Sequence, residues 1–275
     1  MNPEKATTDK AGEDYWSSFW KSAQQLPAAA SLSGKSDNAY LTRQYDAFYS
    51  SIFKKKAEEK KRILEIGCGN SVWLSFFQKE YGFQVFGLDY SEFGCEQTRK
   101  ILERDGCTGE IRRCDLFAPP ADWLGTFDVV CSFGVVEHFT DTAEVIRSIS
   151  RFLKPGGILI TTIPNLNGPT GWLQKVLYRQ VYDIHVVMDK QQLNAAVSKA
   201  GLSEMTSSYF CTLSFGVALE TAGGKPVHYK SIKKMLVKCF QLAGRIFRFI
   251  DDSFVRLPKG KYSSEGIINI SKLKG

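Results

Sequence analysis

The sequence lacks any run of about eighteen apolar residues, so no segment is long enough to cross a bilayer as a helix. Its first ten residues are polar and do not form the apolar stretch of a signal peptide. The seven cysteines include no Cys-x-x-Cys pair and no spacing to histidine typical of a zinc module. We therefore expect the thiols to be reduced and the protein to be cytoplasmic. Peripheral attachment of the protein to a membrane surface is left open.

A strong charge of one sign is also missing. The 36 basic and 29 acidic residues leave a net charge of +7, which does not require a nucleic-acid partner. With 43% hydrophobic and 24% charged residues, the composition is that of a globular protein that can bury a substantial core. No repeat or low-complexity block interrupts it.

Residues 62–70 are the most informative stretch of the sequence. It reads as a buried strand that runs into a glycine turn, with a helical pattern after it. Gly67 and Gly69 allow a sharp turn and leave no Cβ between the main chain and a ligand. A second apolar strand ends in Asp89, close to where a βαβ nucleotide fold presents a carboxylate to ribose hydroxyls.

Strand-like and helix-like segments alternate along the chain. The expected strands are 63–66, 83–88, 109–114, 127–132, 158–163, 202–210 and 266–273, and the expected helices include 72–81, 91–105, 141–153, 171–178 and 189–200. This alternation predicts an α/β fold with a doubly wound, mostly parallel seven-stranded sheet and helices on both faces. An N-terminal helical cap and a helical insertion before the last strand complete it.

The expected organisation is one domain with additions. Residues 1–58 form an N-terminal helical segment, 59–210 the cofactor-binding core with an acceptor-site insertion at 164–187, and 211–275 a basic helical insertion with the final strand. Aromatic residues are frequent between Tyr15 and Phe53. That segment either packs on the edge of the sheet or covers the ligand site.

Five motifs carry a family resemblance. They are Glu65-Ile-Gly-Cys-Gly69, Gly87-Leu-Asp89-Tyr90, Arg113-Cys-Asp115-Leu116, residues 127–138 and Leu153-Lys-Pro-Gly-Gly157. In this order they resemble class I S-adenosylmethionine-dependent methyltransferases over roughly residues 60–210, within the branch that includes the ubiquinone-biosynthesis O-methyltransferases. The resemblance implies S-adenosyl-L-methionine as cofactor and O-methylation of a small or lipid-like acceptor by in-line transfer.

The resemblance also implies roles for individual residues. Gly67 and Gly69 would lie beneath the methionine part of the cofactor, Glu65 would hold its ammonium group, and Asp89 would accept from both ribose hydroxyls. Asp115 would accept from the adenine amine, unless it is only a turn residue. The expected cofactor-binding residues are Glu65, Gly67, Cys68, Gly69, Asp89, Tyr90, Asp115, Leu116, Ser132 and Phe133.

Two other function classes remain open at this point. A nicotinamide-dependent dehydrogenase would need a third glycine after the turn, where the sequence has Asn70, Ser71 and Val72. A regulator that binds the cofactor without catalysis is the non-enzymatic alternative.

Only three histidines are available as bases or ligands: His138, His185 and His228. In the ubiquinone branch a Glu-x-x-Glu-His pattern supplies a metal site, but here Gly134 replaces its first glutamate, so no metal is expected. His138 would be catalytic or would anchor its loop. His185, by resemblance, would be a base or acceptor ligand, with a structural role at the start of a helix as the alternative.

A basic amphipathic stretch occupies residues 229–250. Its apolar residues follow helical spacing opposite six Lys and Arg residues, and it contains no acidic residue. The sequence favours a cap helix with a solvated basic face. Peripheral contact with anionic membrane is the alternative. The expected partner is otherwise a small-molecule acceptor, and the sequence does not indicate an oligomeric state.

Overall fold

The computed structural model describes residues 7–22, 25–55, 60–215 and 231–274. Seven strands form one sheet in the order β3-β2-β1-β4-β5-β7-β6. They are β1 (Arg62–Ile66), β2 (Gln84–Asp89), β3 (Gly109–Arg113), β4 (Phe127–Phe133), β5 (Leu153–Pro164), β6 (Leu202–Thr212) and β7 (Ser264–Leu273). Strand β7 runs antiparallel to β5 and β6, while the other pairs are parallel. The predicted mostly parallel, doubly wound sheet is confirmed.

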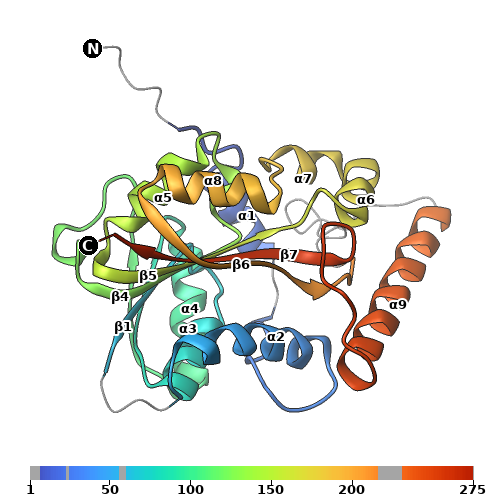
Figure 1. Cartoon of the computed structure of the whole chain (residues 1–275), viewed down its shortest axis with the longest axis horizontal. Helices are drawn as coiled ribbons and strands as arrows, with labels where there is room; N and C mark the ends of the chain where they lie inside the picture. The colour runs from blue at the N-terminus through green and yellow to red at the C-terminus, as the bar shows by residue number, and fades with distance from the viewer. Residues whose placement is uncertain (1–6, 23–24, 56–59, 216–230, 275) are drawn as a thin grey trace.

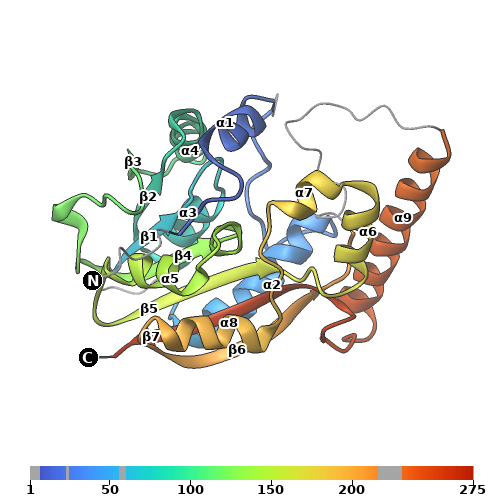
Figure 2. The same ribbon diagram turned by 90° about the horizontal axis from the view of Figure 1, so that it is seen from above.

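Helices cover both faces of this sheet (Figure 1). They are α1 (Glu13–Ser22), α2 (Asp37–Ile52), α3 (Trp73–Phe76), α4 (Glu92–Arg104), α5 (Thr142–Ser150), α6 (Pro169–Leu177), α7 (Arg179–Asp183), α8 (Lys190–Lys199) and α9 (Ser231–Ser253). Helices α5 and α8 lie on one face and α2, α3 and α4 on the other. Seen from above, α6 and α9 lie together at one end of the molecule (Figure 2).

The core is divided between the two faces because successive side chains of a strand point in opposite directions. In β1, Leu64 packs with the side chains of α5 and α8, whereas Ile63 packs with those of α2 and α3. Both side chains are fully buried. Such near-continuous apolar strands are what a parallel sheet covered on both faces requires.

Two predicted helix starts are confirmed by their caps. The Ser91 hydroxyl accepts from the Gly94 N–H at 3.3 Å at the start of α4. At the start of α8, Asp189 and Gln192 form a reciprocal capping box. These caps satisfy N–H groups that have no partner within the helix.

The helix expected over residues 141–153 ends earlier, at Ser150, and Leu153 already belongs to β5. Phe127 of β4 pairs with Leu153, but Val129 pairs with Ile158, so residues 154–157 bulge out of the ladder. The Lys-Pro-Gly-Gly motif is therefore a bulge within a strand and not a helix terminator. The helix expected over 72–81 is also divided, since α3 continues as a π-helical turn at Phe77–Tyr81.

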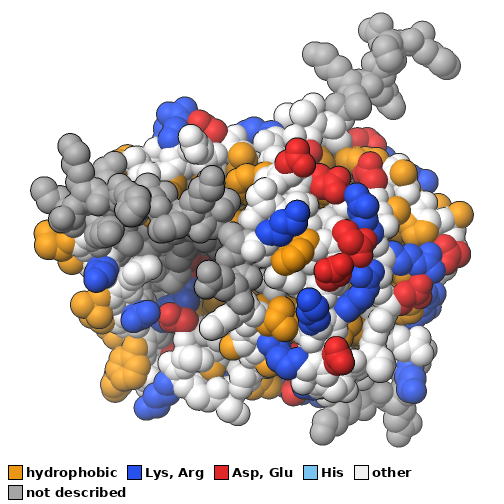
Figure 3. Space-filling model, turned by 180° about the vertical axis from the view of Figure 1, so that it is seen from behind, with side chains coloured by type: hydrophobic (Ala, Val, Ile, Leu, Met, Phe, Trp, Pro, Cys, Tyr) orange, Lys and Arg blue, Asp and Glu red, His pale blue; other side chains and the backbone are white. Residues whose placement is uncertain are grey.

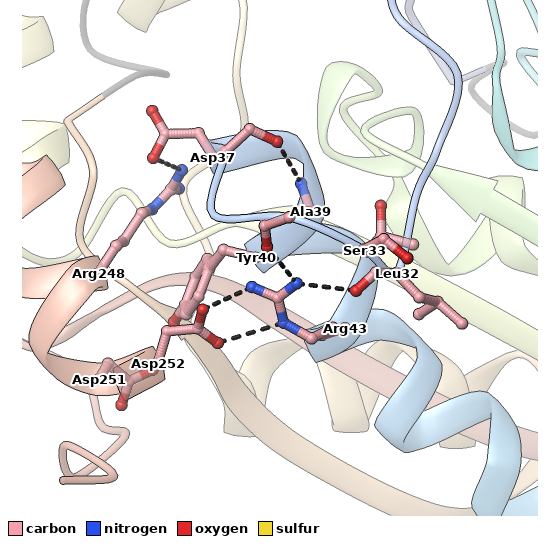
Figure 4. A network of polar contacts seen from close by, with 12 residues as sticks. Leu32, Ser33, Asp37, Ala39, Tyr40, Arg43, Arg248, Asp251 and Asp252 are labelled. Atoms are coloured by element: carbon pink, nitrogen blue, oxygen red, sulfur yellow. Dashed lines mark hydrogen bonds and ion pairs between the residues drawn. The ribbon is translucent and has the colours of Figure 1, made fainter. Parts of the chain in front are cut away.

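Polar contacts hold α9 against α2 (Figure 4) and against Glu265 of β7. The buried guanidinium of Arg248 pairs with Glu265, lies 3.5 Å from the Asp37 carboxylate and stacks on the Tyr40 ring at 5.3 Å. The Tyr40 hydroxyl in turn donates to Asp251 at 2.7 Å. Within the described residues, no helix is long and apolar enough to cross a membrane.

A prediction follows for the Arg248–Glu265 pair. Replacing Arg248 by Ala leaves the Glu265 carboxylate buried without its cation, so the free energy of unfolding should fall by about 3–5 kcal/mol. The matched control is Arg245→Ala on the same helix, whose side chain is 72% exposed and which should cost less than about 1 kcal/mol. Urea unfolding measures both; equal losses would contradict the assignment.

Candidate functional site

A cavity of about 910 Å³ opens where β1, β2 and β4 end. Ligands of open α/β sheets bind in the crevice outside the carboxyl ends of the strands, so this is the expected place for a site. The expected site residues that line it are Glu65, Gly67, Gly69, Asp89, Tyr90, Phe133, His138 and His185. The cavity thus brings the glycine turn and two of the three histidines into one space.

The glycine turn after β1 has no room for side chains. Gly67 adopts φ +71°, and a Cβ placed on it would lie 2.5 Å from Val135. A Cβ on Gly69 would lie 2.7 Å from the indole nitrogen of Trp20. Both positions therefore require glycine, the first by conformation and space and the second by space alone.

Asp89, the last residue of β2, forms a hydrogen bond with this turn. Its carboxylate accepts from the Gly69 N–H at 2.8 Å and from the Ser91 N–H at 2.7 Å. Burial raises the pKa of Asp89 to about 6, and the two backbone donors act in the opposite direction by favouring the charged form. The carboxylate is therefore mainly ionised at neutral pH and faces the cavity.

Glu65 is the most buried carboxyl of the turn region. Burial raises its pKa to about 8, the Ser71 hydroxyl lowers it by donating at 2.6 Å, and the charge of Asp89 raises it further. At neutral pH this carboxyl holds a proton in the absence of a cation. Ser71 is one of the residues found where a dinucleotide fingerprint would carry its third glycine, and its contact with Glu65 was not anticipated from the sequence.

A second group of polar residues lines the same cavity. Glu137 and His138 follow β4, His185 follows α7, and one potential ligand atom from each lies within 4.8 Å of the others. The imidazole Nδ1 of His138 lies 3.1 Å from the Ile184 carbonyl, and that of His185 lies 2.7 Å from the Val181 carbonyl. Because carbonyls only accept, these two contacts favour the tautomer in which Nδ1 carries the proton.

These three side chains are electrically neutral or nearly so at neutral pH. Burial and the neighbouring His185 lower the pKa of His138 to about 3, and burial also lowers the pKa of His185. Burial raises the pKa of Glu137 to about 8, and its buried Oε2 has no hydrogen-bond partner among the described residues. Two neutral imidazoles with one unpaired carboxyl oxygen are a donor set that fits a divalent transition-metal ion.

Four of the expected cofactor residues do not line the cavity: Cys68, Asp115, Leu116 and Ser132. Asp115 is exposed, and its carboxylate accepts from the Phe117 N–H at 2.9 Å. This contact is typical of a turn residue, which was the alternative role considered for Asp115. Leu116 is buried in the core beside Trp123. Cys68 and Ser132 are fully buried as well.

Helix α1 contributes residues that no sequence motif indicated. Trp16, Phe19 and Trp20 line the cavity, and the Trp16 ring meets the His138 ring edge-on at 5.1 Å. The Ser17 hydroxyl lies 3.1 Å from that of Ser91. The sequence left open whether the aromatic N-terminal segment packs on the sheet edge or covers the ligand site. Helix α1 covers the cavity. Helix α2 packs on the face of the sheet, although its Leu41 and Tyr45 also reach the cavity.

Comparison with known proteins agrees with this geometry. A family model described as a methyltransferase domain matches residues 38–206. The chain belongs to this methyltransferase family. The match confirms the expected S-adenosylmethionine-dependent methyltransferase domain, and with it S-adenosyl-L-methionine as the cofactor, and decides against the dehydrogenase alternative.

Curated relatives include the ubiquinone biosynthesis O-methyltransferases of Stutzerimonas stutzeri, 29% identical over 151 residues, and Pseudomonas aeruginosa, 30% identical over 151 residues. Each alignment covers 52% of this chain, and 65% and 64% of the respective relatives. The chain therefore spans less than two thirds of the length of the curated relatives it matches.

Solved structures share the fold. The [4+2]-cyclase SpnF aligns with a TM-score of 0.61 at 15% identity, covering 98% of this chain and 97% of that one. Phosphoethanolamine N-methyltransferase 2 of Haemonchus contortus aligns with a TM-score of 0.59 at 15% identity, covering 95% of this chain and 58% of that one. At such identities the likeness shows the fold alone.

Proposed function

We propose that the chain transfers the methyl group of S-adenosylmethionine to a hydroxyl oxygen of a small or lipid-like acceptor. The observation that carries this proposal is that one cavity is lined by the glycine turn, Asp89, His138 and His185 together. The relatives named ubiquinone biosynthesis O-methyltransferases support oxygen as the acceptor atom. In the reaction an O–CH₃ bond forms as the S–CH₃ bond breaks, the sulfonium becomes a neutral thioether, and the hydroxyl proton passes to a base.

For the cofactor we propose that the Gly67–Gly69 backbone supports the methionine part and that the Glu65 carboxylate faces its ammonium group. Asp89 would accept from the ribose hydroxyls, and Tyr90 and Phe133 would bound the same part of the cavity. Helix α1 would cover the cofactor, since its Trp20 indole already lies over Gly69.

The first prediction concerns Asp89. Asp89→Ala removes the charged acceptor for the ribose hydroxyls and for the Gly69 N–H, so S-adenosylmethionine should bind about 10- to 100-fold more weakly by calorimetry. Asp122→Ala, an exposed carboxylate paired with Arg112, is the control and should bind normally. An unchanged affinity of Asp89→Ala for S-adenosylmethionine would contradict the proposed position of the cofactor.

The second prediction is a pH dependence set by Glu65. Because the free carboxyl has a pKa of about 8, an ammonium can pair with it at lower pH only after its proton is released. Affinity for S-adenosylmethionine should therefore weaken as the pH falls below 8, by up to about tenfold per unit. In Glu65→Gln binding should be weaker and nearly independent of pH in this range; the same slope in both proteins would exclude Glu65 as its source.

For the acceptor we propose that His185 removes the hydroxyl proton or binds the acceptor. His138 is less suited to act as a base, because a pKa of about 3 is far from the pH of a cell. We place His138 beside His185 as the residue that holds the acceptor end of the cavity together. A divalent ion bound by Glu137, His138 and His185 would supply a Lewis acid that lowers the pKa of the acceptor hydroxyl.

The third prediction tests His185. Turnover of His185→Ala should fall about 100-fold, whereas its affinity for S-adenosylmethionine should stay within about twofold of the parent protein. Transfer of a radiolabelled methyl group to a panel of phenolic and aliphatic hydroxyl compounds measures the first quantity, and calorimetry measures the second. Full turnover with an acceptor that the parent protein methylates would contradict this role.

Cobalt(II) titration of the same proteins separates a base from a metal ligand. If His185 is a ligand, the visible absorption of bound cobalt should be present in the parent protein and lost in both His185→Ala and Glu137→Gln. The control is Glu144→Gln, an exposed carboxylate on α5. If cobalt does not bind the parent protein, the base role remains and the metal role is excluded.

We further propose that residues 1–58 and 211–275 are additions that shape the acceptor end of one domain built on residues 59–210. The residues of α1, α2 and α9 in the cavity wall support this organisation. Peripheral contact of α9 with anionic membrane is a separate proposal about partners. The first two residues of the basic stretch, 229 and 230, lie outside the described residues.

A further inference from the structure

The side of α9 that packs on the domain carries buried polar residues together with Phe240, whose ring lies 5.2 Å from that of Phe215. Gly244, Arg248 and Asp251 are buried against the domain, and a Cβ on Gly244 would lie 2.4 Å from the Ser214 carbonyl oxygen. Their spacing of four and three residues places them on one face of the helix. Arg248 pairs with Glu265, and Asp251 pairs with Lys259 at 2.7 Å and accepts from the Tyr40 hydroxyl. Among the basic residues of α9 whose side chains are described, Lys238 and Arg245 are exposed, as the expected solvated basic face requires, whereas Arg248 is buried.

The opposite face of α9 is an exposed apolar stripe, formed by Met235, Leu242, Ile246 and Phe249. Their exposed fractions are 59%, 59%, 49% and 48%. Successive spacings of seven, four and three residues align them along the helix, about half a turn away from Gly244 and Arg248. An exposed apolar surface of this kind is typical of an interaction site.

Positive charge borders the stripe. Lys238 and Arg245 are exposed beside it, and the nearest carboxylate oxygen to the Arg245 guanidinium is that of Asp37 at 3.9 Å. No acidic residue occurs in α9 before Asp251, which is buried. The space-filling view from behind shows hydrophobic and basic side chains alternating along the edge of the molecule that carries α9 (Figure 3).

We propose that this face of α9 docks in the plane of an anionic lipid bilayer, with the stripe among the upper acyl chains and Lys238 and Arg245 at the lipid phosphates. An apolar stripe flanked by cations with long apolar stems is the pattern of an interfacial helix. A second copy of the chain fits less well, because a pair of such helices would bring like charges together. The inference develops the membrane contact proposed above; the docking itself does not depend on methyl transfer, whereas the acceptor class drawn from it rests on the proposed function.

Docking would also place the active-site cavity at the bilayer. Gln241, Arg245 and Arg248 of α9 contribute to the cavity wall. A helix with its side chains is about 10–12 Å across, so a docked α9 would hold the cavity within roughly one helix width of the lipid surface. The acceptor class that fits such a position is an amphiphile presented by the membrane.

Vesicle sedimentation of the full chain tests the proposal. The protein should sediment with vesicles of phosphatidylcholine and phosphatidylserine at low salt and less at high salt, and remain in solution with phosphatidylcholine alone. The double substitution Leu242→Glu with Ile246→Glu should weaken sedimentation at least about tenfold. The control is Met205→Glu, an exposed apolar position on β6, which should bind like the parent protein.

Two results would overturn the proposal: no sedimentation with the anionic vesicles at low salt, or equal sedimentation of the double variant and the parent protein. Sedimentation velocity without lipid shows whether the stripe instead joins two copies, since the double substitution would then convert a dimer into a monomer. Affinity for S-adenosylmethionine, measured on the same variants, should be unchanged. A failure of docking is thus distinguishable from a failure of the proposed cofactor site.

Discussion

The hydrogen bond from the Gly69 N–H to the Asp89 carboxylate is the contact on which the site depends. It forms only because the turn after β1 can approach the end of β2 without an intervening side chain. Glycine is also required within the sheet, because a Cβ on Gly87 would lie 2.6 Å from the Cys68 sulfur. Glycine is needed in the turn and in the neighbouring strand so that these two segments can approach each other beside the cavity.

Burial gives this cavity its chemical character. Three of the carboxyl groups that line it, Glu65, Asp89 and Glu137, have pKa values of about 8, 6 and 8, each raised mainly by the loss of water. The low dielectric that raises these values also strengthens any pairing with a cation. A sulfonium cofactor with an ammonium group, or a metal ion, therefore restores the charged form of a carboxyl that is otherwise protonated. Ligand binding and proton release are coupled in such a site.

The sequence predicted the parts of the fold that local patterns determine. Apolar runs of strand length and the caps at Ser91 and Asp189 identified most of the elements. The bulge at residues 154–157 was missed because it depends on how β5 pairs with β4. In the candidate site, Glu65 and Asp89 follow from the order of motifs. The proximity of His185 to Glu137 does not, because it arises from the path of the chain between β5 and α8.

Helix α9 shows what the spacing of apolar residues in a sequence cannot predict. Spacing reveals that a helix has an apolar side, but not which side meets the domain. Here the choice is made by Asp37 from α2 and Glu265 from β7, far apart in sequence, which together provide a buried position for Arg248. A buried ion pair contributes little net stability but strongly disfavours arrangements that leave one charge unpaired. These polar contacts act together with the packing of Phe240 on Phe215, and the resulting orientation of α9 leaves its apolar stripe on the surface.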